Sequence, residues 1–196
     1  MTQPTVIGVT GGIATGKSTV LAILREHGAI TIDADAVYHS LIAPGGSLVG
    51  PIVGRFGEHV LSDDASIDRR ELAGIVFADP AALAALDWIT HPTVIGAITE
   101  QIDSAAAPLI AVDAVKLIES GMHELCDAVW LVTSDPAVQK ARLMARSGLS
   151  EDEAELRLAA QPDDAFRRQH ADVVLDNSGE LASLRRQVEV ALTLVK

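Results

Sequence analysis

Residues 5–18 read TVIGVTGGIATGKS, and this stretch decides the fold. Its first six residues form a continuous apolar run rich in β-branched side chains, which is typical of a buried parallel strand. The next eight, from Gly11 to Ser18, fit the pattern G-x-x-x-x-G-K-[ST], and a helical pattern follows them directly. Because strand, glycine-rich loop and helix occur in the required order, we expect the segment to bind the phosphates of a nucleoside triphosphate.

The positions of this phosphate loop have separate physical functions. Its glycines allow a tight turn that aims backbone N–H groups at phosphate oxygens, and the helix behind it adds a positive N-terminal dipole. Lys17 supplies a full charge for the β- and γ-phosphates, and the Ser18 hydroxyl can ligate Mg²⁺. The predicted contacts with the nucleotide here are Gly11, Gly12, Ile13, Ala14, Thr15, Gly16, Lys17, Ser18 and Thr19.

Outward from the loop, apolar runs alternate with helical patterns. Further buried strands are expected at 109–113, 128–133 and 171–176, with a shorter one at 29–33. Helices are expected at 18–27, roughly 68–87, 93–104, 136–146, 150–161 and 180–196. This alternation predicts a three-layer α/β fold of the P-loop NTPase type with a five-stranded parallel sheet. Residues 42–68, rich in Gly, Pro and Ser, interrupt the pattern where an open sheet commonly inserts a substrate lobe.

Composition excludes several classes of protein. The 196 residues carry a net charge of −12, which disfavours nucleic acid and anionic membranes as partners. Aromatic residues make up 3%, so the core must be aliphatic, with Trp88 and Trp130 expected inside it. Trp88 could instead border the bound substrate, because it lies three residues before His91. The lone Cys126 excludes a disulfide framework or a cysteine-rich zinc site. The apolar stretches near the start are too short to span a bilayer and residues 1–4 hold no basic side chain, so a soluble cytoplasmic protein is expected. Composition does not determine the oligomeric state, and a monomer is the default expectation.

The reaction depends on what accepts the phosphoryl group. Asn177 is the chain's only asparagine, so the Asn-Lys-x-Asp motif of guanine-specific GTPases is absent, and a kinase of a small metabolite is favoured. Asp33 and Asp35 follow a strand, with Tyr38 and His39 close behind, at the edge where open α/β sheets bind ligands. One interpretation makes this acid cluster the acceptor site. The other makes it a helix cap, with Asp35 capping a helix that runs through Leu41.

Several motifs together resemble the dephospho-coenzyme A kinase family. They are Gly8-Val-Thr-Gly-Gly-Ile-Ala-Thr-Gly-Lys-Ser-Thr19, Asp33-Ala-Asp-x-x-x-His39, His91-Pro-x-Val94, Gln139-x-x-Arg142, Arg146, Gln161, Arg167, Ala171-Asp172 and Asp176-Asn-x-Gly179. The resemblance covers nearly the whole chain. It implies transfer of the γ-phosphate of ATP, with Mg²⁺, to the ribose 3′-hydroxyl of dephospho-CoA, the last step of coenzyme A synthesis.

The resemblance also implies roles for individual residues. Asp33 would be the general base, Asp35 and His39 would shape the acceptor site, and His91 would belong to the acceptor lobe. It implies a core of 1–33, 96–138 and 169–196, a helical acceptor lobe at about 34–95 and a helical lid at about 139–168. Asp113 ends a strand and could orient a Mg²⁺-bound water or position the acceptor. The family's usual Pro-Leu pair after it is replaced by Val115 and Lys116, which puts the acceptor geometry rather than the reaction in question.

The lid segment supplies the local positive charge that an acidic chain needs for binding a triphosphate. Six of the fifteen basic residues lie within it: Lys140, Arg142, Arg146, Arg157, Arg167 and Arg168. Arg142 is the strongest candidate for a contact with the γ-phosphate, and Arg146 lies one turn later on the same face. The acids at 151–155 could instead pair with these residues. Near the last strand, Asn177 or Gly179 could border the adenine, or the segment could be ordinary turn chemistry.

Two other activities stay open at this point. A nucleoside monophosphate kinase would prefer a phosphate as acceptor, and a nucleotide-dependent regulatory protein would hydrolyse ATP or GTP without any metabolite accelerating it.

Overall fold

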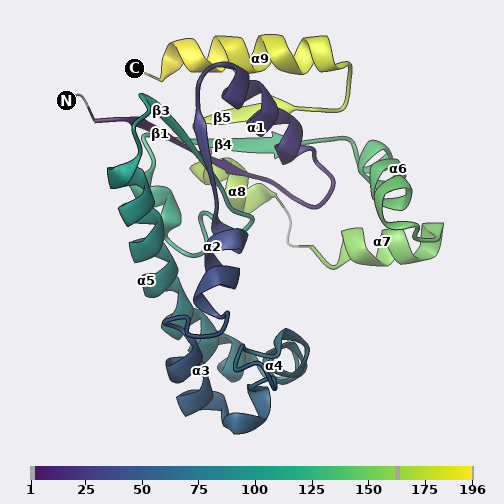
Figure 1. Ribbon diagram of the computed structural model, residues 1–196. Helices are drawn as coiled ribbons and strands as arrows, with labels where there is room; N and C mark the ends of the chain where they lie inside the picture. Colours follow the sequence, from purple (N-terminus) through teal and green to yellow (C-terminus); the bar gives the residue numbers. More distant parts are fainter. Residues whose placement is uncertain (1–2, 162–163, 196) are drawn as a thin grey trace. The chain divides into compact units, whose positions relative to one another are not determined.

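The computed structural model describes residues 3–161 and 164–195, and its chain order follows the alternation expected from the sequence (Figure 1). Five strands form one parallel sheet in the order β2-β3-β1-β4-β5. Their bounds are Thr5–Thr10 for β1, Ile30–Asp33 for β2, Leu109–Asp113 for β3, Ala128–Thr133 for β4 and Val173–Asp176 for β5. The five-stranded α/β fold is confirmed. The first strand lies in the centre, so its carboxyl end delivers the phosphate loop to the middle of the sheet edge.

Two compact units divide the chain. The first consists of residues 1–32 and 105–196 and contains the sheet. Its helices are α1 Lys17–Glu26, α6 Pro136–Ser147, α7 Glu151–Ala159, α8 Ala165–His170 and α9 Leu181–Leu194, with a 3₁₀ turn η2 at Met122–Leu125. The second unit, residues 33–104, contains α2 Ala34–Leu41, α3 Val49–Phe56, the 3₁₀ turn η1 Glu58–Val60, α4 Arg69–Val76 and α5 Pro80–Ser104. The expected last helix reaches Leu194, and Lys196 lies outside the described residues.

Both faces of the central strands are covered, as their continuous apolar sequence requires. One face packs on α1 and α9 through a core that includes Ile7, Trp130, Leu24 and Val188. On the other face Gly8 leaves room for Leu117 and Cys126, because a Cβ at this position would lie 2.6 Å from Leu117 Cδ2 and 2.8 Å from Cys126 Sγ. The short α8 also packs against β4. These layers hold the carboxyl edge of the sheet in a fixed position.

Two aspartates extend the sheet at the start of its strands. The Val6 N–H donates to Oδ2 of Asp127 and the Val129 N–H donates to Oδ2 of Asp172, each at 2.7 Å. Asp172 lies one residue before β5, which begins at Val173, and contributes to the sheet through its side chain. The strand expected at 171–176 is accordingly shorter in the structure.

The prediction of separate helices at 68–87 and 93–104 was wrong. The chain breaks at 77–79 instead, and α5 then runs unbroken through Pro92. The sequence favoured a break at Pro92 because proline lacks the N–H that a helix interior needs. Packing of α5 against α2, α3 and α4 within the second unit stabilises the continuous helix. Among the described helices, only α5 has the length and apolar composition of a membrane span, and 22% of its most apolar window is buried.

Two smaller expectations also need correction. Trp130 is fully buried, as predicted, but Trp88 is 82% exposed on α5 and is not a core residue. The residue that caps α2 is Asp33, not Asp35: its Oδ1 accepts the N–H groups of Asp35 at 2.9 Å and Ala36 at 3.1 Å. The helix begins two residues earlier than the alternative interpretation required.

Candidate active site

The phosphate loop has the backbone that its glycines predict. Gly11 has φ of 152° and a Cβ there would lie 2.4 Å from the carbonyl oxygen of Val132. Gly16 has φ of 93°, and a Cβ there would lie 2.0 Å from Nδ2 of Asn177. Any side chain at these two positions would therefore be strained and would collide with its neighbours. Glycine is required at both positions.

Side chains inside the loop close it on itself. The buried Thr15 hydroxyl donates to the carbonyl oxygen of Gly12 at 3.0 Å, and Nζ of Lys17 donates to that of Gly11 at 3.2 Å. Ser18 is exposed in the first turn of α1. The sequence motif thus produces a compact loop that presents an ammonium group and a hydroxyl at the carboxyl edge of the sheet.

Asn177 holds this loop from the far end of the sequence. Its Nδ2 donates to the carbonyl oxygen of Thr15 at 2.8 Å, and its own N–H donates to that of Thr133 at 2.8 Å. Its carbonyl oxygen accepts the Ser134 hydroxyl at 3.2 Å. This supporting role was not predicted, although a polar residue directly after a strand at the loop's edge of the sheet was the available signal. A contact of Asn177 with the base stays a prediction, as does one of Gly179, which is exposed.

Arg142 reaches the same loop from α6. Its Nη1 lies 3.5 Å from the carbonyl oxygen of Thr15 and 3.4 Å from the hydroxyl of Ser134. Both distances are at the long end of the hydrogen-bonding range, so the guanidinium is held weakly and can turn to an anion at small cost. Arg146 is exposed on α6, and its side chain makes no hydrogen bond or ion pair with any residue that the structure describes, so no contact between it and the loop is present.

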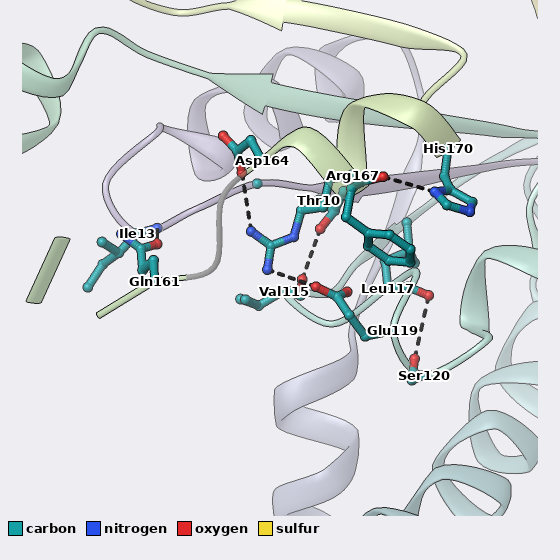
Figure 2. A network of polar contacts seen from close by, with 12 residues as sticks. Thr10, Ile13, Val115, Leu117, Glu119, Ser120, Gln161, Asp164, Arg167 and His170 are labelled. Atoms are coloured by element: carbon teal, nitrogen blue, oxygen red, sulfur yellow. Dashed lines mark hydrogen bonds and ion pairs between the residues drawn. The ribbon is translucent and has the colours of Figure 1, made fainter. Parts of the chain in front are cut away.

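Two glutamines of the segment 139–168 bind the same residue of the loop. Figure 2 shows Gln161 beside Ile13, whose N–H donates to Oε1 of Gln161 at 2.5 Å. Nε2 of Gln139 donates to the carbonyl oxygen of Ile13 at 3.2 Å. The motif quoted for the family contained both glutamines, but sequence reasoning gave neither a role.

The positive charge of Lys140 in this segment is paired with two acidic side chains. Nζ of Lys140 on α6 contacts Oε1 of Glu151 at 2.5 Å and of Glu155 at 2.9 Å, which ties α6 to α7 and raises the pKa of Lys140. These are surface contacts, so they define geometry more than stability. The cluster of basic residues expected from the sequence is thereby reduced, since Lys140 is neutralised by acids of its own segment.

Arg167 is buried rather than exposed to a ligand. Its side chain is 5% exposed, its Nη2 donates to Oε1 of Glu119 at 3.0 Å and its Nη1 donates to Oδ1 of Asp164 at 3.2 Å (Figure 2). Glu119 follows β3 and Asp164 precedes α8, so the pair joins two distant parts of the first unit. Part of the expected lid, residues 162–163, lies outside the described residues.

The donors around the loop fit a hard divalent cation. Within residues 3–161 and 164–195 no group of three or more His, Cys, Asp or Glu side chains could hold a metal ion by itself. However, Ser18 offers a hydroxyl at the start of α1, and Asp113 offers a carboxylate as the last residue of β3. Mg²⁺ prefers oxygen ligands and is usually bound by one or two protein groups together with substrate phosphates. Val115 and Lys116, which follow Asp113, are exposed.

The expected acceptor residues lie in the second unit. Asp33, Asp35 and His39 are exposed on or next to α2. On α5, Nε2 of His91 lies 3.3 Å from Oδ1 of Asp87. Burial raises the pKa of the Tyr38 phenol, which feels the charges of Arg69 and Asp87, so polar groups of α2, α4 and α5 face one another within this unit.

The matching family model and the most similar curated relatives name the same family. The family model described as dephospho-CoA kinase matches residues 5–183. A dephospho-CoA kinase of Symbiobacterium thermophilum is 48% identical over 95% of this chain and 79% of its own length, and one of Geobacter sulfurreducens is 43% identical over 94% and 95%. A crystal structure of a Thermus thermophilus protein is 33% identical over the full length of both chains, with a TM-score of 0.82.

Proposed function

The chain belongs to the dephospho-CoA kinase family and phosphorylates the ribose 3′-hydroxyl of dephospho-CoA with ATP, and we propose that Asp33, Lys17 and Arg142 are its catalytic residues. The observation that carries this assignment is the phosphate loop, built on β1 and held by Asn177, with Arg142 within 3.5 Å of the Thr15 carbonyl oxygen. The remaining steps follow from the chemistry of phosphoryl transfer.

Asp33 is the general base in this proposal. It ends β2 at the edge of the sheet where parallel strands place their ligands, and its Oδ1 is fixed by the N–H groups of Asp35 and Ala36. As the 3′-oxygen bonds to the γ-phosphorus, the carboxylate takes the hydroxyl proton. The bond between the γ-phosphorus and the β–γ bridging oxygen breaks, and ADP leaves with that electron pair.

Lys17 and Arg142 stabilise the charge that develops on the transferred group. The loop N–H groups and the N-terminus of α1 bind the phosphates, and Lys17 lies within the loop where the β- and γ-phosphates bind. Arg142 gives up its two weak contacts to reach the γ-phosphate. Fixed cations in a site that excludes water contribute more than they would in solvent.

Ser18 and Asp113 would hold Mg²⁺, Ser18 with the hydroxyl at the start of α1 and Asp113 with the carboxylate at the end of β3. When bound there, Mg²⁺ would neutralise part of the negative charge of the phosphates. Asp35, His39 and His91 position dephospho-CoA in a lobe formed by the second unit, and residues 139–168 act as the lid. The enzyme is further proposed to act as a monomer in the cytoplasm.

An acceptor panel tests the proposal. ADP release is measured with Mg·ATP alone, with dephospho-CoA and with AMP, and the product is identified by mass. The expected result is ADP release that requires dephospho-CoA and equals CoA formed, and that Lys17→Ala abolishes. Equal stimulation by AMP would indicate a monophosphate kinase, and turnover without an acceptor would indicate a regulatory nucleotidase, so either result would contradict the proposal.

A further inference from the structure

Ile13 is held on both sides of its backbone by the segment that follows β4. Oε1 of Gln161 accepts its N–H at 2.5 Å, and Nε2 of Gln139 donates to its carbonyl oxygen at 3.2 Å. Gln139 comes from α6 and Gln161 comes from the chain just after α7. Two glutamines 22 positions apart therefore fix the orientation of one residue in the phosphate loop.

Gly12 provides the space for this contact. A Cβ at Gly12 would lie 2.8 Å from Oε1 of Gln161 and 3.7 Å from Nε2 of Gln139. Gly12 is not among the glycines with positive φ, so its backbone would accept alanine without strain. The missing side chain at this position is thus explained by the approach of Gln161 rather than by conformation.

The fixed residue precedes the strained part of the loop. Ala14 has φ of 58°, one of two positive values among the described residues other than glycine. A residue with a Cβ keeps such a conformation only where its surroundings determine it. Gln161 holds the Gly12–Ile13 peptide through the Ile13 N–H, and Gln139 holds the Ile13–Ala14 peptide through the Ile13 carbonyl oxygen. The two peptides before Ala14 are therefore both fixed, and the N–H groups of residues 14–18 follow directly.

The backbone of Gln161 is tied to α7. Its N–H donates to the carbonyl oxygen of Leu158 in that helix at 3.2 Å. A side chain can position a loop only if its own backbone is held, and this hydrogen bond fixes Gln161 to the end of α7.

We propose that Gln161 is a positioning residue for phosphate binding. Its Oε1 occupies the space that the absent side chain of Gly12 leaves and accepts the Ile13 N–H there. This hydrogen bond fixes the backbone of the loop so that the N–H groups that follow Ile13 point at the polyphosphate. The inference rests on the proposed function, because it takes the loop as the ATP site. Gln161 acts through Ile13 and needs no contact with the substrate.

The test is a double-mutant cycle with tripolyphosphate as the probe, measured by calorimetry in the presence of Mg²⁺. Gln161→Met keeps the length of the side chain but removes the acceptor, and Gly12→Ala pushes the acceptor away. Each variant is expected to weaken binding about fivefold, the usual effect of one lost hydrogen bond. Because both remove the same contact, the double variant is expected to be about fivefold weaker too, not about 25-fold.

Steady-state kinetics separates positioning from general damage. In both variants KM for ATP is expected to rise about fivefold, with kcat and KM for dephospho-CoA unchanged within about twofold. Gln169→Met is the matched control, because Gln169 is exposed on α8 and its side chain makes no hydrogen bond within the described chain; this variant should bind tripolyphosphate as the unmodified protein does.

Three outcomes would overturn the inference. They are unchanged binding in Gln161→Met, tighter binding, which would mean that Gln161 competes with phosphate, and full additivity in the double variant. Lys17→Ala separates these from failure of the proposed function: it should lose tripolyphosphate binding. If it does not, the loop is not the phosphate site, and both conclusions fail together.

Discussion

The side-chain amide of Asn177 donates a hydrogen bond to the main-chain carbonyl oxygen of Thr15 across 2.8 Å. The two residues are 162 positions apart, yet both are buried at the carboxyl edge of the sheet. The end of the chain therefore sets the shape of a loop near its beginning. This relationship links the fold to the affinity for the nucleotide.

Replacing Asn177 by alanine should weaken both stability and ATP binding. The Thr15 carbonyl oxygen would keep only the long contact with Arg142, and a buried acceptor that loses its partner costs about 1–3 kcal/mol. Urea unfolding and KM for ATP measure the two effects. Asn177→Asp should be worse than Asn177→Ala, because a carboxylate oxygen would then face the carbonyl oxygen. Equal stability of all three proteins would contradict this account.

Replacing Glu119 by alanine should destabilise the first unit. Arg167 is 5% exposed and would keep only Asp164 as its partner, and breaking a buried ion pair costs about 3–5 kcal/mol. Because the Glu119 side chain is 31% exposed, we expect a loss of about 2 kcal/mol, below that range, from urea unfolding. Glu124→Ala is the matched control, as Glu124 is exposed on the same connection and makes no ion pair in the described chain. A Glu119 variant as stable as that control would show that the pair contributes nothing.

Cys126 should make stability fall at alkaline pH. Burial, with a smaller effect of Asp127, raises the pKa of the thiol to about 12, whereas an unfolded cysteine has a pKa of about 8.5. Below about pH 8.5 both states keep the proton, so nothing is lost. Between about pH 8.5 and 12 only the unfolded state releases it, so the free energy of unfolding decreases as pH rises.

Urea unfolding at pH 8 and pH 10 measures this effect of Cys126. The unmodified protein should lose more stability between the two values than Cys126→Ala does, and the folded thiol should react slowly with a disulfide reagent at pH 9. An identical pH dependence in the two proteins, together with fast thiol reaction, would show that Cys126 is not buried as described.

Local rules were sufficient for the sheet and the phosphate loop. The apolar runs at 5–10, 109–113 and 128–133 are buried on both faces of the sheet, so apolar residues occupy nearly every position rather than alternate ones. This continuous pattern marks the ends of each strand, and the predicted bounds match β1, β3 and β4. Gly11 and Gly16 are explained by backbone conformation and by close neighbours, both of which the motif encodes. Asp33 also sits where the motif placed it, at the end of β2.

Tertiary contacts decided what the sequence could not show. The continuity of α5 through Pro92 depends on helices that pack around it, and the exposure of Trp88 depends on which side of that helix they leave uncovered. Lys140 pairs with Glu151 and Arg167 pairs with Glu119. The sequence offers many acids as possible partners for each cation, so composition could not show whether these cations pair with acids of the chain or bind a ligand. The same is true of Asn177, whose partner lies at the other end of the sequence.

The central claim, that Asp33 is the general base, is tested most directly by comparing kcat of Asp33→Asn with that of the unmodified enzyme at saturating ATP and dephospho-CoA. Asparagine caps a helix as well as aspartate does, so α2 and the melting temperature should be preserved while the base is lost. Asp33→Ala is the companion variant and should also lose about 1 kcal/mol of stability with the cap. The account predicts that kcat of Asp33→Asn falls about 10²–10⁴-fold. A folded Asp33→Asn protein that binds ATP and keeps near-normal kcat would contradict it.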